Sequence, residues 1–433
     1  MSRNDLGTEL FARSTRFIDQ GSSDGPASTN PVGAGLAEVG DGIALITAFS
    51  HVVAISGSEG LTLVDTSLAR HADSVLGHLR RWSDDPVKWI VYTHGHVDHV
   101  GGARRFVDEA YERNRPLPQV VAHSAVEERF KRYDDTDGYN GLINSRQFRR
   151  TPGLVPSGTW APDWVWPHVT FTDRLHIDLG GEVAALHHAK GETDDHLWMW
   201  IPSRKTICGG DFLTWVFPNA GNPQKVQRFP LEWAKALREM AALEPEIFLP
   251  AHGLPIEGKE RIGRVLGEIA SALESLVGQT LQMMNAGATF DEVLHTVKIP
   301  AELADRPYLQ ATYDEPEFVV HNIWRLYGGW WDGDPAQLKP SPKAELAREI
   351  ARLAGGADRL AKRAIQLSGD DQLRLACHLA ELAAQAEPSD PEIHAARSEV
   401  YAKRRSTESS LMAKSIFAEA SEKSAALSRT DGQ

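Results

Sequence analysis

Apolar residues in the first two thirds of the chain fall into short runs separated by turn residues, which is the pattern of β-strands. The first runs are joined by tight turns, such as Gly-Ser-Glu-Gly at 57–60, and they predict a β-meander that opens a sheet. The strands predicted in this region are 43–49, 52–56, 61–65, 89–92, 119–123, 182–188, 197–201, 206–208 and 247–249.

Helical spacing alternates with these strands. Apolar residues recur every three or four positions after the meander, and again at 231–243, so each stretch predicts an amphipathic helix. The order of strands and helices predicts two sheets packed face to face with helices outside, an αββα sandwich of the α/β class. The first of these helical faces comprises Leu68, Ala72, Val75, Leu76, Leu79 and Trp82.

The pattern changes near residue 261 to purely helical spacing. Residues 262–284 keep apolar positions three and four apart for more than six turns, which predicts one long amphipathic helix. Short Ala- and Leu-rich helices follow from 344 to about 403. The pair at 373–386 and 391–401, separated by Glu-Pro-Ser-Asp, is similar to a helix pair of the tetratricopeptide kind. We therefore expect an all-α domain after the sandwich.

Three stretches show neither periodicity. Residues 1–36 predict an arm with little core of its own, and the Ser/Ala-rich chain from Arg404 onward predicts a fraying tail. Residues 132–172 are rich in Gly, Pro, Asn and Trp, and we expect an irregular lid or substrate loop there. The predicted organisation is an arm (1–36), a catalytic domain (37–275), a helical domain (276–420) and a tail (421–433).

Composition and charge narrow the class of protein. The net charge of −13 and the lack of a long basic stretch exclude a nucleic-acid partner. Cys208 and Cys377 fall in different predicted domains, so no disulfide framework is expected and a reducing compartment fits. The sequence shows no apolar signal-peptide region at its start and no run long enough for a membrane span, so we expect a cytoplasmic protein.

The densest chemistry lies directly after the predicted strand 89–92. The run Thr-His-Gly-His-Val-Asp-His at 93–99 places His94, His96, Asp98 and His99 within six residues. Ligands with this spacing cannot all point at one atom, but they can serve two metal ions a few ångströms apart. Paired ions of that kind can activate a water and stabilise an in-line displacement. A histidine-rich surface loop is the alternative interpretation.

This run, followed by Val-Gly-Gly, resembles the H-x-H-x-D-H loop of the metallo-β-lactamase superfamily. The resemblance implies three further ligands, each directly after a predicted strand: Glu192, Asp211 and His252. Asp211 would bridge both ions, and Glu192 stands where the superfamily usually has histidine. The cofactors implied are two zinc ions per chain, with iron or manganese as alternatives.

The chain also resembles the alkylsulfatase branch of the superfamily. That branch has Glu at the position of Glu192 and a bridging carboxylate about 19 residues later, where Asp211 stands. In that branch the bridging residue is commonly Glu, so Asp211 is a departure. The segment Y-G-G-W-W-D-G-D-P-A-Q-L at 327–338 and L-A-G-G at 353–356 resemble the alkylsulfatase dimerisation region. This resemblance implies a homodimer. The sterol-carrier-like domain of longer alkylsulfatases is not seen, so shorter or soluble substrates are expected.

The function implied is that of a binuclear metal-dependent hydrolase acting on an alkyl or aryl sulfate ester with an apolar tail. Asp98 and Asp211 would act catalytically together with a water that bridges the metals. The family's sulfate-binding stretch corresponds to 215–225, which contains neither Arg nor His. Arg146, Arg149 or Arg228 could substitute, although a solvated surface arginine is the alternative for each. The candidate substrate contacts are Tyr139, Arg146, Arg149 and Trp331.

Other functions remain open at this point. The same site could hydrolyse a different apolar ester, an ether, an amide or a lactone. Iron-dependent redox or sulfur-oxygenase chemistry on this fold is a second alternative, and a helical adaptor on an inactive metallo-fold is a third. One of His187, His188 and His196 could orient a ligand carboxylate, but packing in the core or at the surface is the favoured interpretation for each, and His123 matches no ligand position.

Overall fold

The computed structural model describes residues 3–21, 29–148 and 160–429. The described residues form two compact units. The first unit comprises those within 1–140, 158–288 and 292–327, and the second comprises those within 141–157, 289–291 and 328–433.

A seven-stranded sheet in the first unit follows the chain order from β1 to β7. Its first four strands are antiparallel neighbours, whereas β4 to β7 pair in parallel. Both faces of this sheet are covered, because Ile43 and Leu45 of β2 join one apolar cluster while Ala44 and Ile46 join the other. The strands are β1 Leu36–Gly40, β2 Ile43–Ile46, β3 Val52–Gly57, β4 Gly60–Val64, β5 Val87–Val91, β6 Gln119–His123 and β7 Val169–Phe171.

The second sheet of this unit has six strands in the order β13-β12-β11-β10-β9-β8. Only β11 and β12 pair in parallel; the other neighbours are antiparallel. The strands are β8 Arg174–Asp178, β9 Val183–His188, β10 Leu197–Ile201, β11 Thr206–Gly210, β12 Ile247–Pro250 and β13 Ile256–Glu257.

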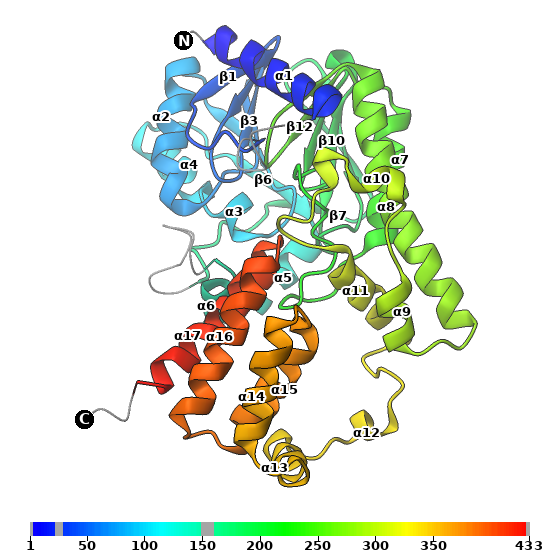
Figure 1. Cartoon of the computed structure of the whole chain (residues 1–433). Coiled ribbons are helices and arrows are strands. Elements are labelled where there is room, and N and C mark those ends of the chain that lie inside the picture. The colour runs from blue at the N-terminus through cyan, green and yellow to red at the C-terminus, as the bar shows by residue number, and fades with distance from the viewer. Residues whose placement is uncertain (1–2, 22–28, 149–159, 430–433) are drawn as a thin grey trace. The chain divides into compact units, whose positions relative to one another are not determined.

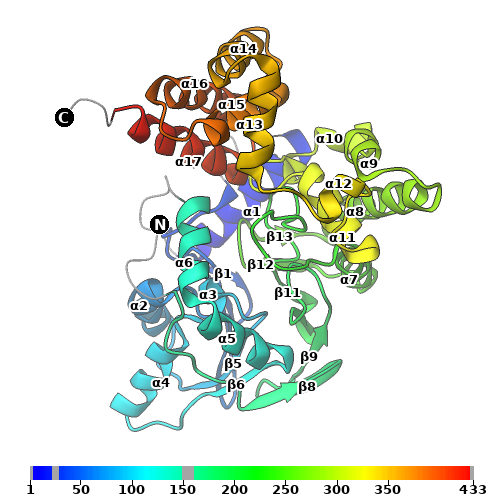
Figure 2. The ribbon, with the colours of Figure 1, turned by 90° about the horizontal axis from the view of Figure 1, so that it is seen from below.

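Helices flank both sheets. Figure 1 shows α2 (Ala72–Trp82) and α4 (Ala103–Glu112) beside the first sheet, with α7 (Pro230–Ala242) and α8 (Lys259–Asn285) beside the second. Figure 2 shows the same layers from below. The αββα prediction is therefore confirmed. The long helix predicted at 262–284 is confirmed as α8, whose apolar side packs into the core with α7.

The expectation of an N-terminal arm with little core is wrong. Residues 3–20 form helix α1 (Arg3–Gln20), and Leu10, Phe17 and Ile18 are buried in the main apolar cluster. The helix lies so close to β1 that a Cβ atom on Gly7 would stand 1.9 Å from the carbonyl oxygen of Glu38. Apolar residues four and seven apart, such as Leu6, Leu10 and Phe17, carry the helical signal.

The expectation of an irregular stretch at 132–172 is wrong for its first part and for its end, where β7 (Val169–Phe171) lies. Helices α5 (Ala125–Asp135) and α6 (Asp137–Gln147) occupy the first part, and 149–159 lie outside the described residues. The buried positions of α6 have helical spacing, but only Ile143 is apolar, while Asn140, Asn144 and Gln147 are polar. A search for apolar periodicity therefore misses this helix. The role of the stretch as a lid stays a prediction.

The second unit is helical. The predicted pair at 373–386 and 391–401 is confirmed as α15 (Leu373–Ala386) and the first part of α16 (Pro391–Thr407). The predicted fraying tail is wrong up to residue 427, because α17 (Leu411–Leu427) continues through it and buries Ser424. The other helices of the chain are α3 Val97–Val100, α9 Phe290–Thr296, α10 Ala301–Ala304, α11 Pro316–Gly328, α12 Pro335–Leu338, α13 Lys343–Ala354 and α14 Ala357–Gly369. Among the described helices, none has the length and apolar character needed to cross a bilayer.

Candidate metal centre

The histidine-rich run follows the end of β5, where the chain turns into the short helix α3. His94 and His96 stand on the loop, while Asp98 and His99 stand on α3. The other three predicted ligands also follow strands: Glu192 comes after β9, Asp211 after β11 and His252 after β12. Strand ends of the two sheets therefore converge on one place in the first unit.

Six of the seven predicted ligands form two clusters with metal-binding geometry. One consists of His94, His96 and Asp211, and the other of Asp98, His99 and His252; within each, the candidate ligand atoms lie within 4.8 Å of one another. In the first cluster, His94 Nε2 is 2.8 Å from His96 Nδ1. In the second, Asp98 Oδ2 is 3.3 Å from His252 Nε2 and 3.6 Å from His99 Nε2.

The Asp211 carboxylate lies between the clusters. Its Oδ2 is 3.8 Å from His94 Nε2, while its Oδ1 is 3.4 Å from His99 Nε2 and 3.5 Å from His252 Nε2. One oxygen therefore faces each cluster, which is the arrangement of a bridging carboxylate.

The buried atoms of this site fit a pair of cations. Within the described residues, His99 Nε2 and Asp211 Oδ1 are buried and have no hydrogen-bond partner. Unpartnered buried polar atoms are uncommon and cost free energy unless something satisfies them. Burial also holds the pKa of His94 and His96 well below the usual range, so both imidazoles are neutral and can act as ligands.

Buried acceptors fix the orientation of two of these histidines. His99 Nδ1 lies 2.7 Å from Asp65 Oδ2, and His252 Nδ1 lies 2.7 Å from the carbonyl oxygen of Phe49. Each ring thereby donates from Nδ1 and leaves Nε2 for its cluster. Asp65 also accepts from the backbone N–H of Thr93 at 2.7 Å. The sequence analysis missed Asp65, although its place at the end of a predicted strand beside β5 was a usable signal.

Glu192 stands at the edge of the first cluster, with Oε1 3.6 Å from His96 Nδ1. The same oxygen lies 2.7 Å from Arg228 Nη1 and accepts from Asn219 Nδ2 at 2.6 Å. Burial raises the pKa of Glu192 to about 7, and Arg228 opposes that rise. The interpretation of Arg228 as a solvated surface arginine is wrong, because its side chain is only 3% exposed. Arg228 instead positions Glu192.

Lys225 and Tyr313 also lie within electrostatic reach of Glu192 and Asp98. Burial lowers the pKa of Lys225 to about 7, and the Lys225 ammonium stands 5.7 Å from the ring centre of Trp160. Burial raises the pKa of Tyr313. The sequence analysis missed both residues, since Tyr313 reaches this place only through the tertiary course of the chain after α8. Lys225 is the last residue of the 215–225 stretch, and it is the cation of a stretch that contains neither Arg nor His.

Four further histidines, none of them a predicted ligand, were considered in the sequence analysis: His123, His187, His188 and His196. Of these, His196 contacts the predicted ligands. Its ring stacks on His94 with ring centres 4.5 Å apart, and its Nε2 lies 3.2 Å from the backbone nitrogen of Asp211, from which it accepts. His123 and His188 stack on each other instead, with ring centres 3.7 Å apart.

The four candidate substrate contacts stay predictions. Tyr139 is exposed in the first unit. In the second unit, Arg146 forms an ion pair with Glu419, and the indole of Trp331 donates to the carbonyl oxygen of Asp334. Arg149 lies outside the described residues.

Comparison with known families identifies the class of protein that this fold and site define. The metallo-β-lactamase superfamily model matches residues 46–252, and the alkyl sulfatase dimerisation model matches residues 289–426. Residues 46–252 therefore form a domain of the metallo-β-lactamase superfamily, which is metal-dependent, and residues 289–426 form an alkyl sulfatase dimerisation domain.

Individual relatives agree with that assignment. A linear primary-alkylsulfatase of Pseudomonas sp. (strain ATCC 19151) is 31% identical over 337 residues, which cover 74% of this chain and 63% of that protein. An (R)-specific secondary-alkylsulfatase of Pseudomonas sp. is 24% identical over 370 residues, which cover 80% of this chain and 55% of that protein. The chain therefore spans less than two thirds of the length of these relatives.

A solved structure shows the same fold. The stereoselective inverting sec-alkylsulfatase Pisa1 from Pseudomonas sp. superposes with a TM-score of 0.79 at 21% sequence identity, covering 97% of this chain and 70% of that chain.

Proposed function

We propose that this protein is a binuclear metal-dependent hydrolase that cleaves a sulfate ester of an alkyl or aryl alcohol, with two zinc ions per chain. The placement of the Asp211 carboxylate between two ligand clusters carries the proposal. One of its oxygens faces each cluster, which is the arrangement expected of a ligand that bridges two ions. The alkylsulfatase names of the relatives favour sulfate esters over other substrates.

His94, His96, Asp211 and Glu192 would hold one ion, and Asp98, His99, His252 and Asp211 the other. Bound there, the pair would supply a water of lowered pKa and positive charge for a developing anion. The chain's own residues fix this geometry: Asp65 orients His99, and Arg228 holds Glu192.

Lys225 and Trp160 are the residues we assign to the substrate. An ammonium within reach of the ligand carboxylates can pair with a sulfate group, and burial strengthens that attraction by excluding water. Trp160 beside it offers an apolar face for the organic group. We expect Lys225→Met to raise the KM for a sulfate ester and to leave the metal content nearly unchanged.

The test combines metal analysis with hydrolysis of alkyl sulfates of several lengths, an aryl sulfate, a phosphodiester, a lactone and an activated aryl ether. The proposal expects about two zinc ions per chain and sulfate release, and it expects Asp211→Ala to lose both. Asp73→Ala is the matched control, since its side chain is 88% exposed. Two ions without sulfate release would discard the sulfate ester and keep the hydrolase. Iron with visible absorption would favour redox chemistry, and turnover by metal-free Asp211→Ala protein would overturn the metal mechanism.

We also propose that the chain forms a homodimer through its dimerisation domain. Trp330 and Leu338, which lie in that part of the second unit, are 72% and 50% exposed. Sedimentation should give a dimer mass, and Trp330→Ala should shift the equilibrium toward monomer. A monomer at micromolar concentration in the unmodified protein would refute this assignment.

A further inference from the structure

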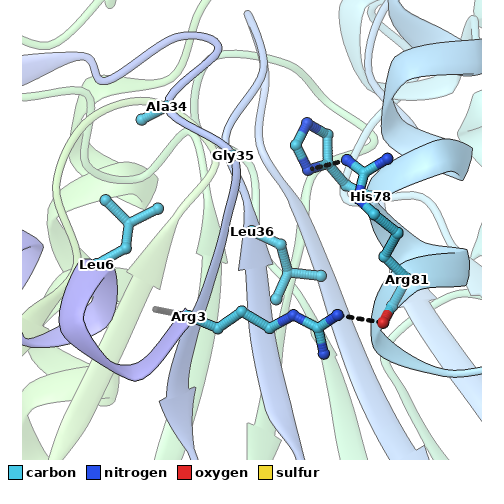
Figure 3. A pocket seen from close by; sticks show the side chains of 7 residues that line it. All are labelled: Arg3, Leu6, Ala34, Gly35, Leu36, His78 and Arg81. Carbon is cyan, nitrogen blue, oxygen red and sulfur yellow. Dashed lines mark hydrogen bonds between the residues drawn. The ribbon is translucent and has the colours of Figure 1, made fainter. Parts of the chain in front are cut away.

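A cavity of about 230 Å³ lies in the first unit, away from the residues of the metal clusters. It opens between the first turn of α1, the start of β1 and the last turns of α2 (Figure 3). Two guanidinium groups, an imidazole and two leucines contribute most of its wall: Arg3, Arg81, His78, Leu6 and Leu36.

The two guanidinium groups and His78 Nε2–H supply the donors of this cavity. Arg81 Nη2 lies 2.8 Å from His78 Nδ1, and a guanidinium can only donate, so the ring accepts there and carries its proton on Nε2. The Arg3 guanidinium donates to the carbonyl oxygen of Arg81 at the end of α2, which holds it at the rim. Each guanidinium has further N–H groups beyond these single contacts.

The positive charge of the cavity is not compensated locally. Within the described ranges, Arg3 donates to a carbonyl oxygen and Arg81 to an imidazole rather than to a carboxylate, and no acidic residue lines the cavity. The acidic residue of β1, Glu38, accepts from Trp82 Nε1 at 3.1 Å. The donors of this cavity offer local positive charge to an anion, although the chain has a net charge of −13.

The remainder of the wall is apolar and firmly placed. Leu6 and Leu36 face the cavity in Figure 3, and α1 is fixed by the close approach of Gly7 to β1. Gly35, at φ +122°, leaves space that a side chain would occupy: a Cβ atom there would stand 3.5 Å from His78 Cε1 and 3.9 Å from Leu6 Cδ2. The volume is below the roughly 300 Å³ of sites for drug-sized ligands, so only a small ligand fits.

We propose that this cavity binds a short-chain organic anion, with a carboxylate or sulfate head held by Arg3, Arg81 and His78 Nε2–H and an apolar chain against Leu6 and Leu36. The site is separate from the proposed catalytic centre and does not depend on bound metal. Because both guanidinium groups are solvent-accessible, the affinity should fall as salt is raised.

Calorimetric titration of the full chain, loaded with zinc, with hexanoate tests the proposal. We expect Arg81→Ala and Arg3→Ala each to weaken this binding about tenfold or more. The control Arg352→Ala removes an exposed arginine from α13 and should leave binding unchanged. Asp211→Asn should also keep it, which separates this cavity from the metal centre and from any failure of the proposed function. Hexanamide, the neutral analogue, should bind at least tenfold more weakly than hexanoate.

Three results would overturn the proposal. The first is hexanoate binding of equal strength in Arg81→Ala and the unmodified chain. The second is loss of binding in Asp211→Asn alone, which would place the ligand on the metal centre. The third is equal affinity for hexanoate and hexanamide, which would refute an anion site. Inorganic sulfate that binds as tightly as hexanoate would refute the part assigned to Leu6 and Leu36.

Discussion

The buried ion pair between Arg129 of α5 and Asp195 offers a quantitative test of how the metal loop is held. Arg129 Nε donates to Asp195 Oδ2 at 2.6 Å, and the two side chains are 2% and 0% exposed. The same carboxylate oxygen accepts from the backbone N–H of Gly95 at 3.0 Å. Since Gly95 separates His94 from His96, Asp195 fixes the peptide that carries both histidines. We predict the effect of Arg129→Met on stability and on metal affinity.

The size of the effect follows from what remains after the substitution. Removing one partner of a buried pair typically costs about 3–5 kcal/mol, because the other charge stays buried. Asp195 keeps the Gly95 N–H, so we expect the lower end, a loss of about 3 kcal/mol in the free energy of unfolding. Arg129→Met combined with Asp195→Asn leaves no buried charge and should lose only about 1 kcal/mol. Metal affinity should fall about 10- to 100-fold in Arg129→Met, as expected when support behind a ligand is lost.

The assay is urea unfolding of metal-free protein, which separates the fold from the stabilisation by bound metal. Metal affinity is measured separately by competition with a chelator. Lys131→Met on the same helix is the control, since the Lys131 side chain is 56% exposed and its pair with Glu128 should contribute less than about 1 kcal/mol. If Arg129→Met stays within 1 kcal/mol of the parent and binds zinc equally well, Asp195 does not hold the loop as argued.

Three further predictions concern the fold around the site. Burial raises the pKa of Asp314 to about 6, so the stability contributed by its protonated form is lost as the pH rises from about 4 through 6. Asn stays neutral over that window. The free energy of unfolding of Asp314→Asn in urea should therefore gain up to about 3 kcal/mol relative to the parent as the pH rises. Gly209→Ala would place a Cβ atom 2.2 Å from the Phe248 ring and should cost about 1–3 kcal/mol of stability. Gly278→Ala, at a position within α8 where a Cβ atom meets nothing within 4 Å, should be neutral or stabilising. Equal unfolding midpoints of the two variants would contradict this. Leu10→Ala should lose about 2–5 kcal/mol if α1 belongs to the core, and a loss below 1 kcal/mol would argue that it does not.

The sequence predicted the sandwich because its strands are short apolar runs that end in glycine, proline or polar residues. The sequence analysis did not predict β1, β7, β8 or β13, and the last two lie where this contrast is weak. β8 reads Arg-Leu-His-Ile-Asp with one fully buried residue, and β13 contains only two residues. Helix α6 escaped for a related reason, because asparagine and glutamine occupy most of its buried positions. Apolar periodicity therefore fails to predict an element whose buried side chains are polar.

The residues of the candidate site also fall into those that the sequence predicts and those that it does not. Strand-end placement and the resemblance together located His94, Asp211 and His252, because the ends of neighbouring strands meet at one edge regardless of what the loops do. The groups that position or surround them were not predictable from local pattern. Arg228 resembles any surface arginine in sequence, and only the folded chain brings it to 2.7 Å from Glu192. Asp314 is similar, since it holds the loop at 221–222 by accepting two backbone N–H groups.

The charges around the two clusters explain why Arg228 matters beyond its contact with Glu192. Four carboxylates, from Asp65, Asp98, Glu192 and Asp211, lie in or directly behind the ligand set, and Arg228 is the guanidinium that pairs with one of them. Two divalent cations would offset the carboxylates, so the excess positive charge that attracts an anionic ester would then come from Arg228. Glu in place of His at 192 adds one negative charge, and the buried arginine compensates it. Lys225, with a pKa of about 7, adds a further positive charge when it is protonated. With both cations and Arg228 in place, the proposed site would present net positive charge to an anionic ester even though the usual histidine is absent.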